Sequence, residues 1–176
     1  MRLKSTSTHY GAVAMTIHWV SAAAIFGLLI SGTIMTGAGE GVKASILPVH
    51  ATIGVTVLLL TLLRIGWWRW ADKRPQPVAN QPHSQHLAAR IVHGLLYAGI
   101  IVLAASGIAT LAFSGAIPAL LAGTAPPDFS ELPPRLAHGL VGKALIALVV
   151  LHAGAALYHQ FIRRDRLLGR MGVGPA

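Results

Sequence analysis

Two segments, VHATIG at residues 49–54 and AHGLVG at residues 137–142, place a histidine four residues before a glycine at the start of a long apolar run. A further histidine, His152, follows His138 by fourteen residues in the same run. On a helix this spacing brings the two side chains within ~40° of each other and separates them by ~21 Å along the axis. One helix can therefore present two imidazoles on one side at two heights.

These histidines suit the binding of a metal. Neutral imidazole is a common metal ligand, and two imidazoles that face each other across a bundle can hold a haem iron from both axial sides. His50 opens the second apolar run at a depth that matches His138, and His18 in the first run matches His152. The sequence therefore predicts two ligand pairs, and hence two haems at different depths.

The glycines that follow two of these histidines fit the same interpretation. A porphyrin that lies against a helix needs a backbone without a side chain about one turn from its ligand, and Gly54 and Gly142 would supply it. Glycine is also common in membrane helices as a packing residue. Both roles stay open for these two positions.

Other uses of histidine inside a membrane compete with haem ligation. A hydrogen bond between helices and a proton relay are both known uses of such polar groups. A histidine proton relay or a small transporter without a cofactor is therefore the alternative from another class. A bare non-haem metal is disfavoured because the acidic residues fall in connections or the tail. These residues are Glu40, Asp72, Asp128, Glu131 and Asp165.

The elements that must position the histidines are membrane-spanning helices. Of the 176 residues, 54% are hydrophobic and only 11% are charged, which is far from the composition of a soluble domain. Four apolar runs are long enough to cross a bilayer, and only helices satisfy the backbone there. We expect these helices at approximately residues 12–35, 46–68, 91–113 and 136–162. The predicted fold class is all-α, an integral membrane four-helix bundle, with residues 1–176 as a single domain.

Basic residues give the orientation. The net charge of +9 is distributed over particular connections, which argues against a nucleic-acid partner. With both termini in the cytoplasm, only Lys43 and Arg135 lie on the outer side, as the positive-inside rule favours. The first apolar run is too long for a signal-peptide core, so we expect a retained helix. Cysteine is absent, which excludes iron–sulfur clusters held by the chain's own thiolates.

Two histidines nearer the cytoplasmic side, His93 and His159, are alternative ligands for the inner pair. We prefer His18 and His152 because their depths agree better. The shallower residues, with Arg90 and Tyr158, could instead hydrogen-bond a quinone, supply its protons or hold a haem propionate. A plain interfacial location is the competing interpretation for both histidines.

Four other residues have no assigned chemistry. His9, His83 and His86 lie in polar segments and are expected at the surface. Lys143 is about 140° from His138 on the same helix, so we expect it to point away from the haem face.

The chain resembles the bacterial cytochrome b561 family, which are four-helix di-haem b proteins of the inner membrane. The resemblance extends over nearly the whole chain and is carried by the order of the segments YGAVAMTIHW, LPVHATIG, LAARIVHGLLY and LHAGAALYHQFIRRDRLLGRM. It implies two haem b groups, one with the axial ligands His18 and His152 and the other with His50 and His138.

The resemblance also implies an oxidoreductase that passes electrons between a donor on the outer side and the membrane quinone pool, with ubiquinone as the acceptor. One branch of the family is similar to superoxide oxidases, but fast capture of an anion needs a positive outer surface. The outer connections here hold two basic residues against three acidic ones, so the donor stays open. A haem-bearing anchor subunit for a separate redox enzyme is the alternative within this class. Membrane lipid and quinone are expected partners, and a homodimer or a partner redox protein is compatible with the sequence.

Overall fold

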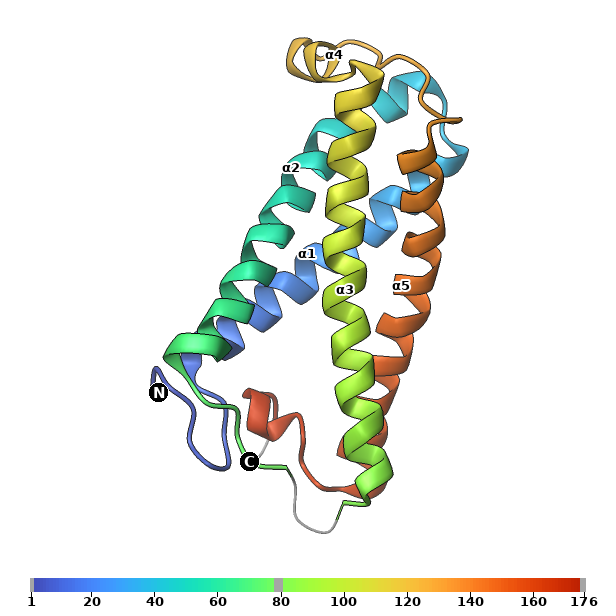
Figure 1. Ribbon diagram of the computed structural model, residues 1–176. Coiled ribbons are helices and arrows are strands. Elements are labelled where there is room, and N and C mark those ends of the chain that lie inside the picture. The colour runs from blue at the N-terminus through green and yellow to red at the C-terminus, as the bar shows by residue number, and fades with distance from the viewer. Residues whose placement is uncertain (1, 78–80, 175–176) are drawn as a thin grey trace.

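Four long helices form a bundle in the computed structural model, which describes residues 2–77 and 81–174 (Figure 1). They are α1 (Ala12–Gly37), α2 (Glu40–Gly66), α3 (His83–Ser114) and α5 (Pro133–Leu157), and a short helix α4 (Ile117–Ala122) connects α3 to α5. Two helices continue into π-helical turns, α2 into Trp67–Ala71 and α5 into Tyr158–Arg163. A 3-10 turn, Gly169–Met171, lies near the C-terminus. The described residues contain no strand, so the predicted all-α fold is confirmed.

Each long helix, with its π-helical turn where it has one, is apolar enough to span a membrane. The spans are 26 to 32 residues long. Three helices begin earlier than the apolar runs predicted, because polar residues outside the hydrocarbon layer continue the same backbone hydrogen bonding. α3 ends where Gly115 takes the left-handed conformation, with φ of 68°, and donates its N–H to Leu111.

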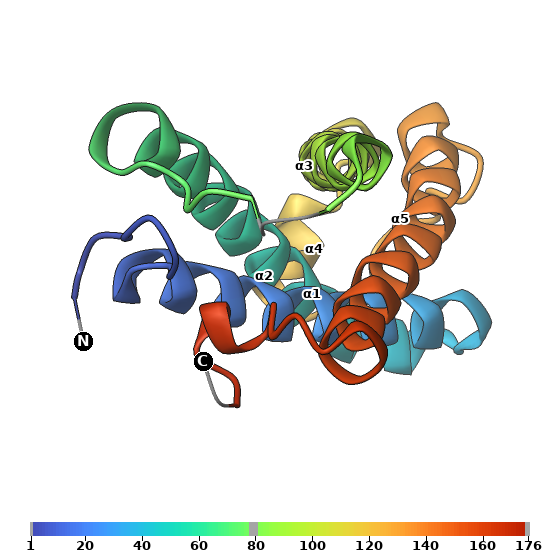
Figure 2. The same cartoon turned by 90° about the horizontal axis from the view of Figure 1, so that it is seen from below.

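The helices pack as two close pairs, α1 with α2 and α3 with α5. The N- and C-terminal segments lie at one end of the bundle, which we call the terminal end, and α4 lies at the other, which we call the α4 end (Figure 1). Towards the terminal end α2 diverges from α3, as the view along the bundle also shows (Figure 2). This arrangement brings the inward faces of all four helices around one central axis.

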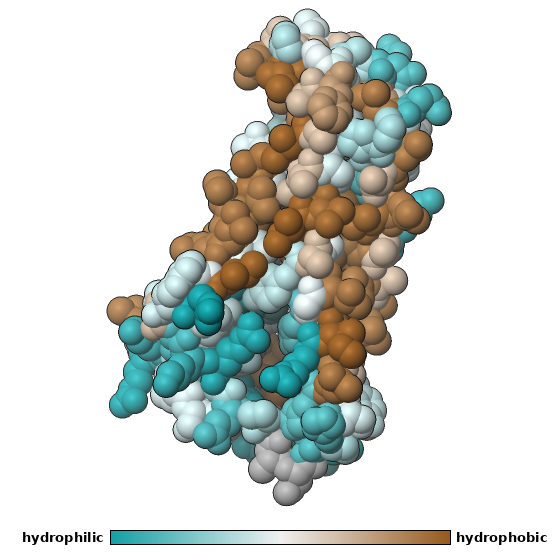
Figure 3. Space-filling view, viewed as in Figure 1, coloured by the Kyte–Doolittle hydropathy of each residue, from teal (hydrophilic) through white to brown (hydrophobic). Residues whose placement is uncertain are grey.

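Apolar side chains mostly face outwards, as expected in lipid. Hydrophobic residues cover the middle of the bundle, and hydrophilic residues gather at the terminal end (Figure 3). Few side chains are fully buried, and four of the buried residues are polar: Ser21, Thr61, Ser106 and Thr110. The interior therefore carries polar groups, which suit a binding site better than a packed apolar core.

Asp72 closes the terminal end by joining the N-terminal segment to the end of α2. Its Oδ2 atom accepts hydrogen bonds from the Ser5 hydroxyl at 2.8 Å and the Ser5 backbone N–H at 3.0 Å. The indole Nε1 of Trp67 donates to the same oxygen at 3.2 Å. The C-terminal segment joins this layer through Arg170, which donates to the carbonyls of Thr8 and Gln76 at 2.6 Å each.

Candidate functional site

The structure brings the predicted histidines together in two pairs. At the α4 end, His50 of α2 and His138 of α5 face each other with ring centroids 6.2 Å apart. Nearer the terminal end, His18 of α1 and His152 of α5 have ring centroids 6.3 Å apart. α5 contributes to both pairs, as its fourteen-residue spacing predicted.

The separation within each pair fits an iron atom between two imidazoles. A metal–imidazole bond is about 2 Å long, so two such bonds and the two distances from nitrogen to ring centre add up to roughly 6 Å. Both pairs have this separation. The two pairs therefore match the distance between ring centres that axial ligation requires.

His93 of α3 also lies beside His152, but at a different distance. Their ring centroids are 5.2 Å apart with an interplanar angle of 73°, which is an edge-to-face ring contact. This distance leaves too little room for iron between the two rings. The geometry therefore favours His18 over His93 as the partner of His152.

His159 lies outside both pairs and has a carboxylate partner. Its Nδ1 is 2.5 Å from Oδ2 of Asp165, and the Gln81 side-chain amide donates to the same oxygen at 3.4 Å. The ring of Tyr158 contacts His159 edge-on at 5.8 Å. The second carboxylate oxygen of Asp165 is buried without a hydrogen-bond partner. The arrangement is a histidine–carboxylate pair at the terminal end, suited to holding or moving a proton.

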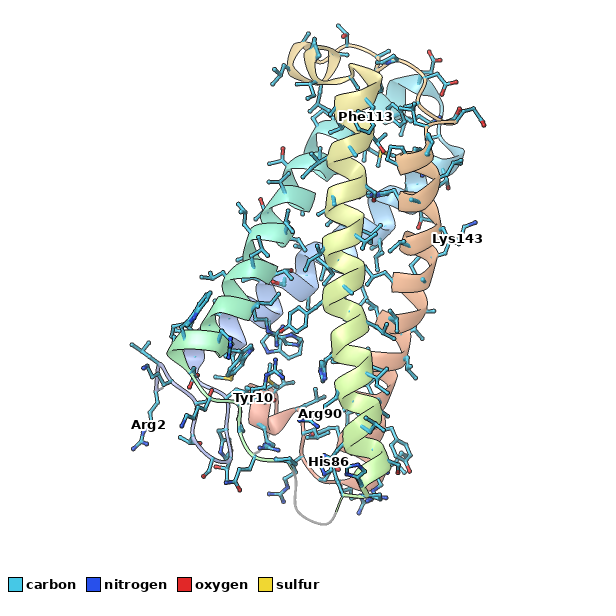
Figure 4. All side chains as sticks on the ribbon, in the orientation of Figure 1. Arg2, Tyr10, His86, Arg90, Phe113 and Lys143 are labelled. Atoms are coloured by element: carbon cyan, nitrogen blue, oxygen red, sulfur yellow. The ribbon has the colours of Figure 1, made fainter. Side chains whose placement is uncertain are left out.

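The other predicted residues lie nearer the surface. Arg90 lies in the first part of α3 at the terminal end, and Lys143 projects outwards from α5 (Figure 4). Both side chains are exposed, as is His83, while His86 is partly exposed. His9 accepts or donates a hydrogen bond with the Thr8 hydroxyl at 2.8 Å in the N-terminal segment.

The glycines one turn after His50 and His138 have open space beside them. A Cβ atom at Gly54 would meet no heavy atom within 4 Å, and one at Gly142 would meet only Leu103 Cδ2 at 4.0 Å. Nothing from a neighbouring helix packs tightly against either glycine. This fits a flat group lying against the backbone better than close helix packing.

Two serine–glycine dipeptides that we did not single out from the sequence hold the histidines at the α4 end. Ser31 Oγ is 2.8 Å from Nδ1 of His50, and Ser106 Oγ is 3.2 Å from Nδ1 of His138. Each hydroxyl also donates to the carbonyl three residues earlier in its own helix, so its oxygen is left to accept from the imidazole. A hydrogen bond that fixes the proton on Nδ1 leaves Nε2 free for a metal.

The glycine after each serine makes room for the imidazole ring. A Cβ atom at Gly107 would lie 3.2 Å from Cε1 of His138, and one at Gly32 would lie 3.5 Å from Cε1 of His50. The signal for these residues was the dipeptide Ser-Gly repeated in the first and third apolar runs. Only the packing of the helices shows that each dipeptide faces a histidine.

Arg64 is a further residue beside the histidines for which the sequence predicts no role in the site. It lies in the last turn of α2, and its Nη1 is 2.9 Å from Nδ1 of His18. Its Nε is buried without a hydrogen-bond partner. A half-buried guanidinium with a buried, unused donor, next to a predicted ligand, calls for an acceptor.

The described residues contain no cluster of three or more His, Cys, Asp or Glu side chains that could hold a bare metal ion. The site instead offers isolated pairs of imidazoles. Two axial ligands suffice when a porphyrin supplies the other four nitrogens, so the donor set fits haem.

A membrane-spanning four-helix bundle with facing imidazoles defines a class of protein, the membrane cytochromes b. Comparison with known proteins agrees with this class. The family model described as prokaryotic cytochrome b561 matches residues 9–174. The chain belongs to this family, and it is a multi-pass bacterial membrane protein that binds haem b and transfers electrons.

Three curated relatives span much of the chain. Cytochrome b561 homolog 2 of Escherichia coli is 27% identical over 183 residues, covering 97% of this chain and 95% of the relative. Cytochrome b562 of Cereibacter sphaeroides is 31% identical over 168 residues, covering 92% and 94%. Cytochrome b561 homolog 1 of Escherichia coli is 34% identical over 127 residues, covering 69% and 70%.

Proposed function

We propose that the chain carries electrons across the membrane through two b-type haems, one held by His50 and His138 and the other by His18 and His152. The observation that carries this proposal is the presence of two imidazole pairs, each with ring centroids about 6 Å apart, at different heights in one bundle. Haem supplies the one-electron chemistry, and the protein sets axial ligation, hydrogen bonding and burial.

Polar groups of the interior prepare the two ligands at the α4 end. Ser31 and Ser106, with the Leu103 carbonyl at 2.9 Å, hold Nδ1 of the two histidines at the α4 end. The imidazoles therefore keep one ring orientation and one tautomer, so little has to be reorganised when iron is bound.

The electron acceptor in this proposal is ubiquinone, bound at the terminal end. A quinone takes up protons when it is fully reduced, so its site needs a proton carrier. The His159–Asp165 pair is such a group, because an imidazole held by a carboxylate can give up a proton and regain it from water. Tyr158, next to this pair, can hydrogen-bond a quinone oxygen.

The terminal end faces the cytoplasm of the bacterial inner membrane in this proposal. Most basic residues lie at this end, while Lys43 and Arg135 lie near the other, which is the distribution that the positive-inside rule describes. The donor then approaches the α4 end. Glu40, Asp128 and Glu131 reduce the positive charge there, so a superoxide donor is less favoured than a neutral or cationic one.

The test is a reduced-minus-oxidised absorption spectrum with haem quantitation on purified protein. We expect two haems per chain in the wild type, and loss of one haem in each of His50→Ala and His152→Ala. The spectral changes in the two variants should differ, because each variant loses a different haem. His93→Ala is the matched control and should retain both haems. Full haem content in both ligand variants would show the assignment to be wrong.

A further inference from the structure

The two close helix pairs carry the same residue pattern. In α1, His18 precedes the dipeptide Ser31–Gly32 by thirteen residues, and in α3, His93 precedes Ser106–Gly107 by thirteen residues. The dipeptides have the same role in both helices, because each serine contacts a histidine of the neighbouring helix. The first half of the bundle is therefore a structural counterpart of the second.

The second helix of each pair continues the correspondence. His50 and Arg64 are fourteen residues apart in α2, as His138 and His152 are in α5. The pattern thus places Arg64 at the position that a haem ligand occupies in the other half. At fourteen residues Arg64 lies within ~40° of the direction of His50 on the helix and ~21 Å along it. Arg64 therefore faces the interior at the height of the His18–His152 pair.

The contact between Arg64 and His18 is incompatible with ligation of iron by His18 through Nε2. Arginine has only donors, so Nδ1 of His18 accepts from Nη1 in the observed contact of 2.9 Å. A neutral imidazole whose Nε2 binds a metal carries its proton on Nδ1 and cannot accept. When His18 binds iron, the guanidinium must find another acceptor.

The side-chain carboxylates of the residues that the structure describes do not supply this acceptor. Both oxygens of Asp72 accept hydrogen bonds from Ser5, and Asp165 pairs with His159. The remaining acidic residues, Glu40, Asp128 and Glu131, flank the helices at the α4 end. The ionisable groups near Arg64 are the phenols of Tyr10 and Tyr97, the guanidinium of Arg74 and imidazoles of the site, and none of them is a carboxylate. The half-buried guanidinium of Arg64 therefore lacks an anionic partner among the described side chains.

We propose that Arg64 binds a propionate carboxylate of the haem held by His18 and His152. The assignment rests on the proposed function, since propionates are the anionic groups that haem itself brings into the site. A pocket of about 600 Å³ between the end of α2 and α3 has further cations on its wall. It is lined by Ile65, Trp68, Arg69, Asp72, Lys73, Arg74 and Tyr97. Arg64 directly precedes Ile65 of this wall in the chain, so the guanidinium belongs to the same end of α2 as the exposed cations.

The experiment compares Arg64→Gln and Arg64→Lys with the wild type and with Arg2→Gln as the control. Arg2 is an exposed arginine at the same end of the bundle, and no site role is assigned to it. Two quantities are measured: the rate at which each haem passes to an acceptor apoprotein, and the midpoint potential of each haem.

Arg64→Gln should release one of the two haems about tenfold faster than the wild type does, because one charge-assisted hydrogen bond is lost. The potential of that haem should fall, because a positive charge that opposes the ferric state is removed. The release rate and potential in Arg64→Lys should lie between those of the wild type and Arg64→Gln, and Arg2→Gln should match the wild type.

Reconstitution with haem dimethyl ester separates a propionate contact from a general structural role. The ester has no carboxylates, so wild type and Arg64→Gln should lose it at the same rate. A tenfold difference that persists with the ester would overturn the assignment, as would a loss of haem in Arg2→Gln equal to that in Arg64→Gln.

Failure of this inference can be told from failure of the proposed function. A wild-type protein without haem would refute both. Two haems in the wild type, with unchanged release and potentials in Arg64→Gln, would refute only the role of Arg64. Where Arg64→Gln does not accumulate in the membrane, the ester comparison on Arg64→Lys and the wild type decides the question.

Discussion

Among single residues, the hydrogen bonds to Nδ1 of the histidines at the α4 end differ in number. His50 has one partner at this atom, the Ser31 hydroxyl at 2.8 Å. His138 has two, the Leu103 carbonyl at 2.9 Å and the Ser106 hydroxyl at 3.2 Å. Because a carbonyl can only accept, it fixes the proton on Nδ1 of His138 without help from the serine.

We therefore predict unequal effects of two matched substitutions. Ser31→Ala removes the partner of His50 and should speed release of the haem at the α4 end by about tenfold, in line with the loss of a hydrogen bond behind a metal ligand. Ser106→Ala should change the rate less than threefold, because the Leu103 carbonyl remains. Transfer of haem to an apoprotein measures both rates. Equal effects, or a larger effect of Ser106→Ala, would contradict the role given to the carbonyl.

At the scale of helices, the two serine–glycine dipeptides differ in how closely the facing histidine approaches. The Cβ of an alanine at position 107 would lie 3.2 Å from Cε1 and 3.4 Å from Nδ1 of His138, which is tighter than ordinary contact. At position 32 the nearest atom, Cε1 of His50, is 3.5 Å away. α3 and α5 therefore tolerate less added volume at their glycine than α1 and α2 do.

This difference predicts that Gly107→Ala displaces the imidazole of His138 while Gly32→Ala leaves His50 in place. Gly107→Ala should broaden or shift the absorption bands of the haem at the α4 end and lower its occupancy, since a small displacement of a ligand weakens its bond to iron. Gly32→Ala should have the spectrum of the wild type. Low-temperature reduced spectra and haem quantitation check both variants. A wild-type spectrum for Gly107→Ala would show that α3 and α5 can move apart without cost.

What the sequence could predict depends on whether the information lies within one helix or between helices. The fourteen residues between His138 and His152 fix their relative direction in any α-helix, so the two levels of imidazoles were predictable. The serine–glycine dipeptides and Arg64 act on histidines of a neighbouring helix, 19 and 46 residues away for Ser31 and Arg64. Their role depends on helix packing, which no spacing within one helix reveals.

The ends of the helices were predictable only in part. α3 ends close to the predicted position because Gly115 can adopt the left-handed conformation that closes a helix. The π-helical turns after α2 and α5 have no comparable signal, since an i→i+5 hydrogen bond depends on what lies around the turn. The sequence likewise places Asp165 in the tail, and its contact with His159 forms only because the chain turns back after Arg163.

Over the whole molecule, the terminal end is held together by contacts between segments far apart in the chain. Asp72 binds Ser5, which lies 67 residues earlier, and Arg170 binds the carbonyl of Thr8, 162 residues away. Partial burial by itself would raise the pKa of Asp72, but hydrogen bonds from Ser5, Lys73 and Trp67 outweigh it and lower the pKa below its ordinary value of 3.8. The charged carboxylate is therefore the form that ties the N-terminal segment to α2.

The lowered pKa predicts how this tie depends on pH. A carboxyl group whose pKa is lower in the folded state stabilises that state fully above its ordinary pKa, and the stabilisation is lost as the pH falls through the folded value. At neutral pH, Asp72→Asn should therefore weaken the protection of the Ser5 amide from hydrogen exchange. A loss on the order of 1 kcal/mol is expected, because asparagine keeps one acceptor oxygen but not the charge. Wild type and variant should converge when the pH falls well below 3.8. Asp128→Asn, at the α4 end, is the control and should leave the protection of Ser5 unchanged at every pH. A difference between wild type and Asp72→Asn that stays constant from neutral to acidic pH would mean that the charge of Asp72 does not hold the segment.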